Sequence, residues 1–284
     1  MPPRSNPSAR QQRLGAELRK LREDAGLSTE QAAALLDTKR TVISSTEAGR
    51  HGVSPERVRR IAYVYECTDR PLIDALVAMC GSDQPPGWWE DFRDTLPSTF
   101  LDVAELEWHA AALRVSTITH MPGQFQTEAY ARALFRAAIP PLPEAEFEAR
   151  VAHRVQRHQV LDRPDAPPYE LVIHEGALRT QVGGPAALRA QLAHLTEAAA
   201  RPNVTIQAIP FTAGAFPGSG QSILYAHGAV PRLDTVLADR VTAGEFLHAD
   251  AHVRTFGLQL DEMQRIALPP EKTLDLMHTI ASDL

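Results

Sequence analysis

The chain has 284 residues, with 44% hydrophobic and 23% charged side chains and a formal net charge of −6, which suits about two globular domains and excludes a fibrous or wholly disordered protein. Its apolar runs are shorter than the roughly 20 residues of a membrane-spanning helix, and its first ten residues lack the apolar core of a signal peptide, so we expect a cytoplasmic protein. The two cysteines, Cys67 and Cys80, are too few for a disulfide framework and are not spaced for a zinc site.

A flexible arm is predicted over residues 1–9, followed by a domain of five short helices over residues 10–80. Leucines recur at helical spacing before Gly26, a residue suited to ending a helix. Ser28 stands three residues before a glutamine, the spacing of a capping box that begins the next helix. The predicted helices begin near residues 11, 28, 39, 54 and 71.

A linker is predicted over residues 81–100, because the stretch GSDQPPGWW is rich in proline and glycine and holds Trp88 and Trp89, which we expect to be exposed. The remaining residues, 101–284, form a larger predicted domain. Its helices are expected over residues 103–121, 127–138, 143–161, 185–200, 249–266 and 270–284, and its strands over 169–173, 204–209, 221–225, 234–238 and 245–247. The predicted fold class is therefore mainly α with a mixed α/β part: a five-helix domain followed by a larger α+β domain.

Charge is distributed unevenly between these two parts. Residues 1–66 hold 12 Lys and Arg against 8 Asp and Glu, whereas the rest of the chain holds 17 against 27. A basic module on an acidic body is the arrangement expected when only one part approaches a polyanion.

The second and third predicted helices have the spacing of a helix-turn-helix, which lays its second helix in the major groove of DNA. Arg40 and Thr41 begin the third helix, where a guanidinium can bind a guanine edge and a threonine methyl can meet thymine. Phosphate contacts are expected from basic and hydroxyl side chains around them. The predicted DNA-binding residues are Thr29, Lys39, Arg40, Thr41, Ser44, Ser45 and Arg50.

Residues 13–66 resemble the phage-repressor and Xre type of helix-turn-helix domain. The resemblance rests on Arg13-Leu14-Gly15, Leu18-Arg19, Leu21-Arg22, Gly26-Leu27-Ser28, Ala33, Ile43-Ser44 and Glu47-Ala48-Gly49-Arg50. It implies a structural pair between Arg22 and Glu47 that ties the first helix to the end of the third. Asp37 stands where that family commonly has glycine, so we expect a slightly different turn but the same fold.

The rest of the chain is similar to the companion domain of WhiJ-like actinobacterial regulators. The similarity rests on Met121 to Thr127, Tyr130-Ala131-Arg132, the three arginines Arg150, Arg154 and Arg157, Glu175 to Arg179, Val182-Gly183, Gln191-Leu192 and Ile206 to Pro210. It implies a sensing or partner-binding domain, often accompanied by a small protein encoded alongside, and it implies no catalytic residue.

Candidate partner- or ligand-binding residues in the larger domain are Gln126, Tyr130, Arg132, Arg150, Arg154, Arg157, Glu175 and Arg179. The three arginines at 150, 154 and 157 fall on one face of one helix and suit an acidic partner or a phosphate-bearing ligand, although an ion-pair face is an open alternative. His248 and His252 are spaced to share a metal but lack a third ligand, so we expect no metal and no cofactor.

These features predict a sequence-specific transcription regulator that binds operator DNA as a homodimer and is not an enzyme. Its larger domain is expected to receive a signal, most simply a small partner protein encoded alongside. The alternatives are an antitoxin-like autoregulator that neutralises its partner, a regulator that senses a small molecule, and an enzyme with a DNA-targeting module.

Overall fold

The computed structural model describes residues 6–80, 87–239 and 244–284, and it divides into two compact units. The first unit comprises residues 1–88 and 229–233, and the second comprises residues 89–228 and 234–284. Residues 1–5 of the predicted arm and residues 81–86 of the predicted linker lie outside the described residues. Within the described part of the chain, no helix is long and apolar enough to span a bilayer.

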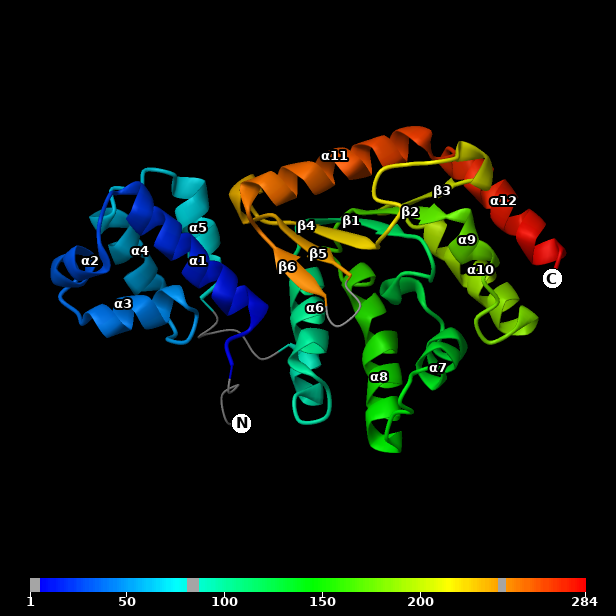
Figure 1. Ribbon diagram of the computed structural model, residues 1–284, viewed down its shortest axis with the longest axis horizontal. Helices are drawn as coiled ribbons and strands as arrows, with labels where there is room; N and C mark the ends of the chain where they lie inside the picture. Colours follow the sequence, from blue (N-terminus) through cyan, green and yellow to red (C-terminus); the bar gives the residue numbers. More distant parts are fainter. Residues whose placement is uncertain (1–5, 81–86, 240–243) are drawn as a thin grey trace. The chain divides into compact units, whose positions relative to one another are not determined.

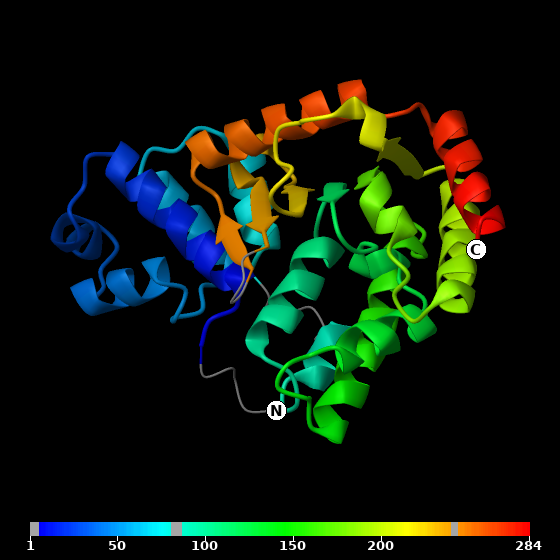
Figure 2. The same cartoon turned by 45° about the vertical axis from the view of Figure 1, so that its right-hand side comes forward.

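The first unit is a bundle of five helices, as predicted (Figure 2). Its core is aliphatic: Leu18, Ile43, Val58 and Leu72 are each at most 3% exposed. The helices are α1 (Ala9–Asp24), α2 (Thr29–Leu35), α3 (Arg40–Glu47), α4 (Pro55–Val64) and α5 (Arg70–Ala78).

Capping residues fix where these helices begin. Ser8 and Ser28 each form a complete capping box with the glutamine three residues on, and Ser54 accepts a hydrogen bond from the backbone N–H of Arg57. The predicted arm over residues 1–9 is thus too long, because Ser8 caps α1 and Ala9 is its first residue.

The second unit contains a six-stranded mixed sheet in the order β3-β2-β1-β4-β5-β6. Strands β1, β2 and β3 run parallel, and β4, β5 and β6 continue the sheet by antiparallel pairing. The strands are β1 (Ala112–Thr117), β2 (Tyr169–His174), β3 (Val204–Ile209), β4 (Ile223–His227), β5 (Thr235–Ala238) and β6 (Glu245–Leu247).

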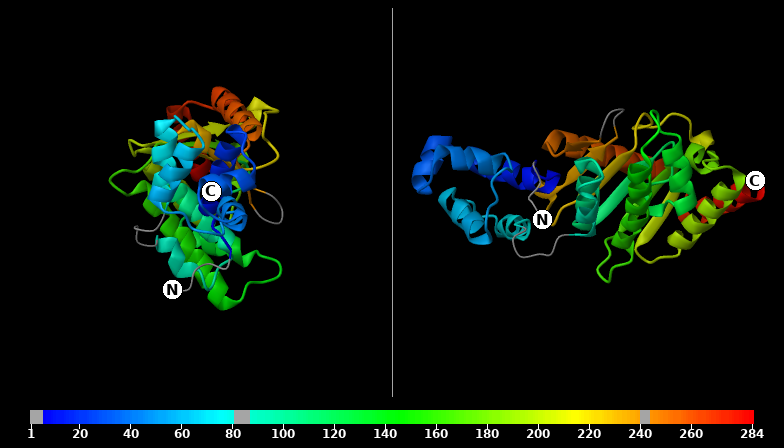
Figure 3. Two further views of the ribbon diagram at one scale, coloured as in Figure 1. Left: turned by 90° about the vertical axis from the view of Figure 1, so that its left-hand side faces the viewer. Right: turned by 90° about the horizontal axis from the view of Figure 1, so that it is seen from below.

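Helices cover both faces of this sheet (Figures 1 and 3). Helix α11 (Asp250–Ile266) packs on one face, where Leu260 and Met263 meet Val172 and Tyr225. The other face carries α6 (Ser98–Trp108), α7 (Glu128–Arg136), α8 (Glu144–Gln156), α9 (Glu175–Arg179) and α10 (Pro185–Ala199), and α12 (Pro270–Ser282) packs against β3 and α10. Short 3₁₀ turns cover Trp88–Phe92, Gly123–Phe125, Arg157–Leu161, Phe211–Ala213 and Pro231–Leu233.

The structure corrects the helix predicted over residues 103–121, because α6 ends at Trp108 and residues 112–117 form the central strand β1. The strand alternates Leu113 and Val115 with Arg114 and Ser116, the period of two that is typical of a strand, and its run VSTIT is rich in β-branched residues, so both signals for a strand were present. The helix predicted over residues 143–161 also ends earlier, since α8 stops at Gln156 and a 3₁₀ turn follows.

The predicted linker and domain boundary need correction too. Trp89 is only 4% exposed, and its ring lies 6.0 Å from the ring centroids of Trp108 and His109. The second unit therefore begins at residue 89 rather than 101. Residues 229–233, predicted within the larger domain, group with the first unit, where Arg232 pairs with Glu17 at 2.7 Å.

Candidate functional site

The first candidate site is the surface of α3. Ile43 and Thr46 face the core, at 3% and 9% exposed, and this fixes which side of the helix points outward. Arg40, Thr41 and Ser44 are exposed, whereas Ser45 is half-buried. The arrangement provides a polar helix face with an arginine in its first turn, which is suited to the major groove.

The turn before α3 contains Asp37, which stands where the resembling family commonly has glycine. Asp37 has a φ of +48°, the left-handed conformation that glycine adopts most readily and that aspartate tolerates. Lys39 then forms the exposed N-cap of α3. The aspartate therefore adopts a backbone conformation that glycine can also adopt.

An ion pair that the sequence did not predict involves Arg40. Its Nη1 lies 2.9 Å from Oε1 of Glu30 on α2, and both side chains are more than half exposed. The Thr29 hydroxyl donates to the other oxygen of Glu30 at 3.0 Å. Because water screens an exposed pair, the guanidinium is free to exchange Glu30 for a base edge.

The pair implied between Arg22 and Glu47 is present and joins α1 to the end of α3. Arg22 donates from Nε and Nη2 to the two carboxylate oxygens of Glu47, at 2.6 and 3.0 Å, and from Nη1 to the carbonyl of Leu27. The Glu47 carboxylate raises the pKa of Arg22. This bidentate pair fixes the orientation of α3 within the bundle.

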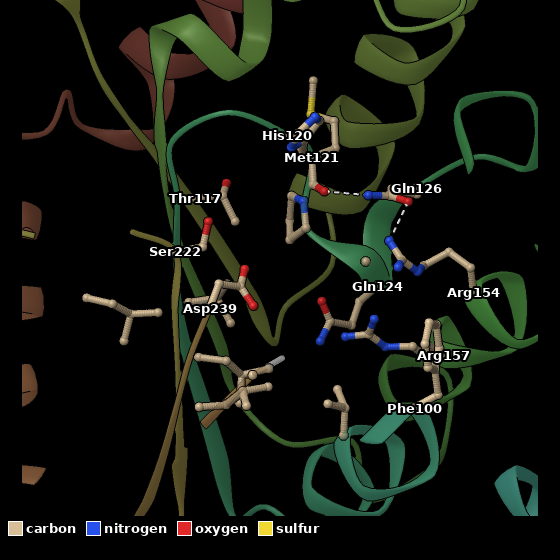
Figure 4. Close-up of a pocket in the computed structure, with 18 of the residues that line it drawn as sticks. Phe100, Thr117, His120, Met121, Gln124, Gln126, Arg154, Arg157, Ser222 and Asp239 are labelled. Carbon is tan, nitrogen blue, oxygen red and sulfur yellow. Dashed lines mark hydrogen bonds between the residues drawn. The ribbon is translucent and has the colours of Figure 1, made fainter. Parts of the chain in front are cut away.

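The second candidate site is a cavity of about 360 Å³ in the second unit. Strands β1 and β5 run in the same direction, and the cavity opens beside their carboxyl ends. Figure 4 shows Arg154 and Arg157 on one side of the cavity and Thr117, Ser222 and Asp239 on the other. In open α/β sheets ligands bind at such an edge, where the strand order changes direction.

A hydrogen-bonded network supports the arginine wall of the cavity. Arg157 pairs with Glu107, which is 1% exposed, through Nε at 3.0 Å and through Nη2. Gln124 donates to the same carboxylate at 2.6 Å. Burial opposes the charge of Arg157, but the Glu107 carboxylate overrides this effect and raises its pKa. The charge of Arg157 is thus neutralised by Glu107, and the pair holds the wall of the cavity in place.

Arg154 differs from Arg157 because it has no carboxylate partner among the described residues. Its Nη1 donates to Oε1 of Gln126 at 2.8 Å, and the Gln126 amide in turn donates to the carbonyl of Met121 at 2.7 Å (Figure 4). Its Nε finds no acceptor within the described part of the chain. Burial, followed by the nearby charge of Arg157, lowers the pKa of Arg154 to about 9.

Only three of the predicted ligand-binding residues line the cavity: Gln126, Arg154 and Arg157. The others are engaged elsewhere. Tyr130 accepts a hydrogen bond from the backbone of Met121 inside the core. The remaining residues form ion pairs, Arg132 with Glu128 and Glu148, Arg150 with Glu146, and Arg179 with Glu175.

Sequence reasoning missed Glu107, Gln124 and Asp239. Glu107 was hidden inside a predicted helix whose remainder proved to be a strand. Gln124 belongs to the stretch Met121 to Thr127, so the resemblance was its signal. Gly123 in that stretch leaves room for the guanidinium of Arg157, which a Cβ would meet at 2.4 Å.

His153, which also lines the cavity, predicts a pH dependence of stability. Burial, and then the charges of Arg157 and Arg154, lower its pKa to about 3. Below pH 6.5 His153 binds a proton in the unfolded chain but not in the folded chain. The free energy of unfolding therefore falls as the pH drops, with a slope that approaches roughly 1.4 kcal/mol per pH unit. Urea unfolding should therefore show wild type losing about 1.6 kcal/mol more than His153→Phe between pH 6.5 and 5. Equal losses would contradict the low pKa.

No group of three or more His, Cys, Asp and Glu side chains within residues 6–80, 87–239 and 244–284 is arranged to hold a metal ion. His248 and His252 belong to this searched part of the chain. Glu175, another candidate for chemistry, accepts from the backbone of Phe211 at 2.8 Å and from Arg179 at 2.7 Å. Glu175, the first residue of α9 after β2, thus links this helix to the 3₁₀ turn that follows β3, which is a structural role.

Comparison with protein families gives two matches. A family model described as "Domain of unknown function (DUF5753)" matches residues 100–279, and a model described as "Helix-turn-helix domain" matches residues 13–76. Comparison with curated proteins and with solved structures gave no match. The two matched ranges correspond to the sheet-containing unit and to the helical bundle.

Proposed function

The chain belongs to the DUF5753 family and carries a helix-turn-helix domain, and from this premise we propose that it is a sequence-specific transcription regulator that binds operator DNA. The observation that carries the proposal is the α2–turn–α3 arrangement, in which buried Ile43 and Thr46 turn Arg40, Thr41 and Ser44 outward. In this proposal the protein acts at the nucleoid in the cytoplasm and catalyses no reaction.

The proposal includes a homodimer on DNA. Three or four base-reading side chains cover too few base pairs for selectivity in a genome, and a two-fold dimer doubles the number of base pairs that are recognised. The half-sites would then lie about one helical turn, roughly 34 Å, apart.

The second unit is proposed to receive the signal. A signal alters DNA binding only if it favours one of two conformations or oligomers of the regulator. A small partner protein encoded alongside is one candidate signal, supported by the resemblance, and a small molecule is the other. If the chain were instead an antitoxin-like autoregulator, the neighbouring gene product would be toxic when expressed alone.

The experiment that tests DNA reading compares two neighbouring basic residues. With an operator selected from random DNA, we expect Arg40→Ala to weaken operator binding about tenfold to hundredfold while changing binding to random DNA much less. Lys39→Ala should weaken binding to both DNAs alike and reduce the slope of log affinity against log salt by about 1, because it removes one phosphate contact.

The salt-dependent affinities are measured by fluorescence anisotropy on both DNAs. Equal losses on operator and random DNA for Arg40→Ala would refute its contact with a base. Failure of the wild type to select any sequence would refute the proposed function itself.

A further inference from the structure

Arg154 differs from the other buried arginine of the cavity, Arg157, because no carboxylate of the described residues lies within ion-pair distance of it, although Glu107 and Asp239 are near enough to attract its charge. No ion pair formed within the described residues includes it, whereas Arg114, Arg132, Arg150, Arg157, Arg163, Arg179, Arg201 and Arg265 all form one. Its guanidinium lies 4.9 Å from the centre of the Phe135 ring and keeps Nε unpaired beside the cavity. An uncompensated, largely desolvated charge is costly unless an anion joins it.

The nearest carboxylate across the cavity does not close this gap. Asp239 lies on the opposite wall from Arg154 (Figure 4), and the two form no salt bridge among those of the described residues. The Thr117 hydroxyl on that wall is buried and also lacks a partner within the described residues. The cavity thus has a positive charge on one wall and a negative charge and an unpaired hydroxyl on the other. This arrangement suits a ligand whose polar groups contact both walls.

Apolar side chains form a further part of the cavity wall, beside polar residues such as His120 and Gln124. Phe100 and Val103 of α6, Leu134 of α7, and Leu224 and Leu237 of the sheet line the same cavity. Such surfaces hold the carbon skeleton of a small molecule, while a few polar groups fix its orientation.

We propose that this cavity binds a small organic anion, whose carboxylate or phosphate group is held by the Arg154 guanidinium and whose apolar part lies against Phe100, Val103 and Leu134. The inference rests on the proposed function, because it names the class of signal that the second unit receives. Carboxylate and phosphate share the planar, two-point hydrogen bonding that a guanidinium fork offers. A hydroxyl or amine of the ligand would donate to Asp239 on the far wall.

The test uses a matched pair of fluorescent probes and no DNA, so that its failure is distinct from failure of the proposed DNA reading. The probe 8-anilino-1-naphthalenesulfonate carries a sulfonate, and N-phenyl-1-naphthylamine has the same rings without it. We expect the wild-type full-length protein to bind the sulfonate at one site per chain and more tightly than the neutral probe. Binding of the neutral probe at equal affinity would overturn the proposal.

Arg154→Met removes the charge but keeps a side chain that can pack on Phe135. We expect it to weaken sulfonate binding about tenfold to hundredfold and to leave the neutral probe unaffected, since a hydrogen bond to a charged group is lost. Arg265→Met, at a 68% exposed arginine of α11, is the matched control and should leave both affinities unchanged. Unchanged sulfonate binding by Arg154→Met would overturn the proposal.

Two further measurements keep the test decisive. Arg154→Lys keeps the charge and loses the fork, so it should fold even if the methionine variant does not, and should weaken sulfonate binding to an intermediate extent. Benzoate and phenyl phosphate have the same aromatic ring but different anionic groups, a carboxylate and a phosphate. The compound that displaces the sulfonate probe at the lower concentration identifies which anionic group the cavity prefers. Displacement by neither would show that the probe is not held through its anion.

Discussion

Replacing Glu107 by leucine is expected to destabilise the second unit by about 3 to 5 kcal/mol. Glu107 is 1% exposed and accepts hydrogen bonds from Arg157 and Gln124, so its loss leaves a buried guanidinium and a buried amide without their acceptor. A leucine of similar size fills the space but cannot neutralise Arg157. The cost is therefore that of an unpaired buried charge rather than that of a cavity.

Urea unfolding followed by tryptophan fluorescence measures this effect, because Trp89 and Trp108 lie in the second unit. The double variant Glu107→Leu with Arg157→Met removes both charges and should recover most of the lost stability. Glu148→Leu breaks an exposed pair with Arg132 and should leave the unfolding midpoint close to that of wild type. A double variant as unstable as the single one would show that the buried pair itself stabilises the fold.

Gly15→Ala is expected to lower the stability of the helical bundle by about 3 kcal/mol and to abolish operator binding. A Cβ at Gly15 would lie 2.6 Å from the backbone carbonyl oxygens of both Thr46 and Glu47. Backbone atoms cannot rotate away as a side chain can, so α1 and α3 must separate. The separation would disturb the Arg22–Glu47 pair and the orientation of α3 together.

Hydrogen exchange of peptides from α1 and α3 measures the loss of stability, and fluorescence anisotropy measures operator binding. Gly52→Ala is the control, since a Cβ there meets nothing within 4 Å. We expect its exchange rates and DNA affinity to match those of wild type. Wild-type protection of α3 in Gly15→Ala would contradict the close approach of the two helices.

Local sequence signals predicted the five helices of the first unit, apart from the first residues of α1. The capping box of Ser28 and the Ser-Pro pair at Ser54 marked helix starts, and both signals act within four residues, whereas the capping box of Ser8 lay inside the predicted arm. The inward positions of Ile43 and Thr46 followed from helical periodicity, and this periodicity also determined which side chains of α3 are exposed.

Local signals failed where the surroundings decide the structure. Strand β1 follows α6 after only three residues, so the alternation of Leu113 and Val115 with Arg114 and Ser116 was absorbed into one helix predicted over residues 103–121. Trp89 was expected in a linker because its neighbours are proline and glycine, but contact with Trp108 buries it. Both outcomes depend on residues distant in sequence.

At the cavity, too, the sequence predicted some features and the tertiary structure decided others. The sequence placed Arg150, Arg154 and Arg157 on one helical face but could not tell them apart, because spacing does not reveal which carboxylate each arginine meets. Arg150 pairs with Glu146 four residues before it on the same helix, whereas only the tertiary structure pairs Arg157 with Glu107 and places Arg154 beside a cavity across from Asp239. Helix capping and periodicity are properties of neighbouring residues, whereas the partner of a buried charge is set by how distant segments pack.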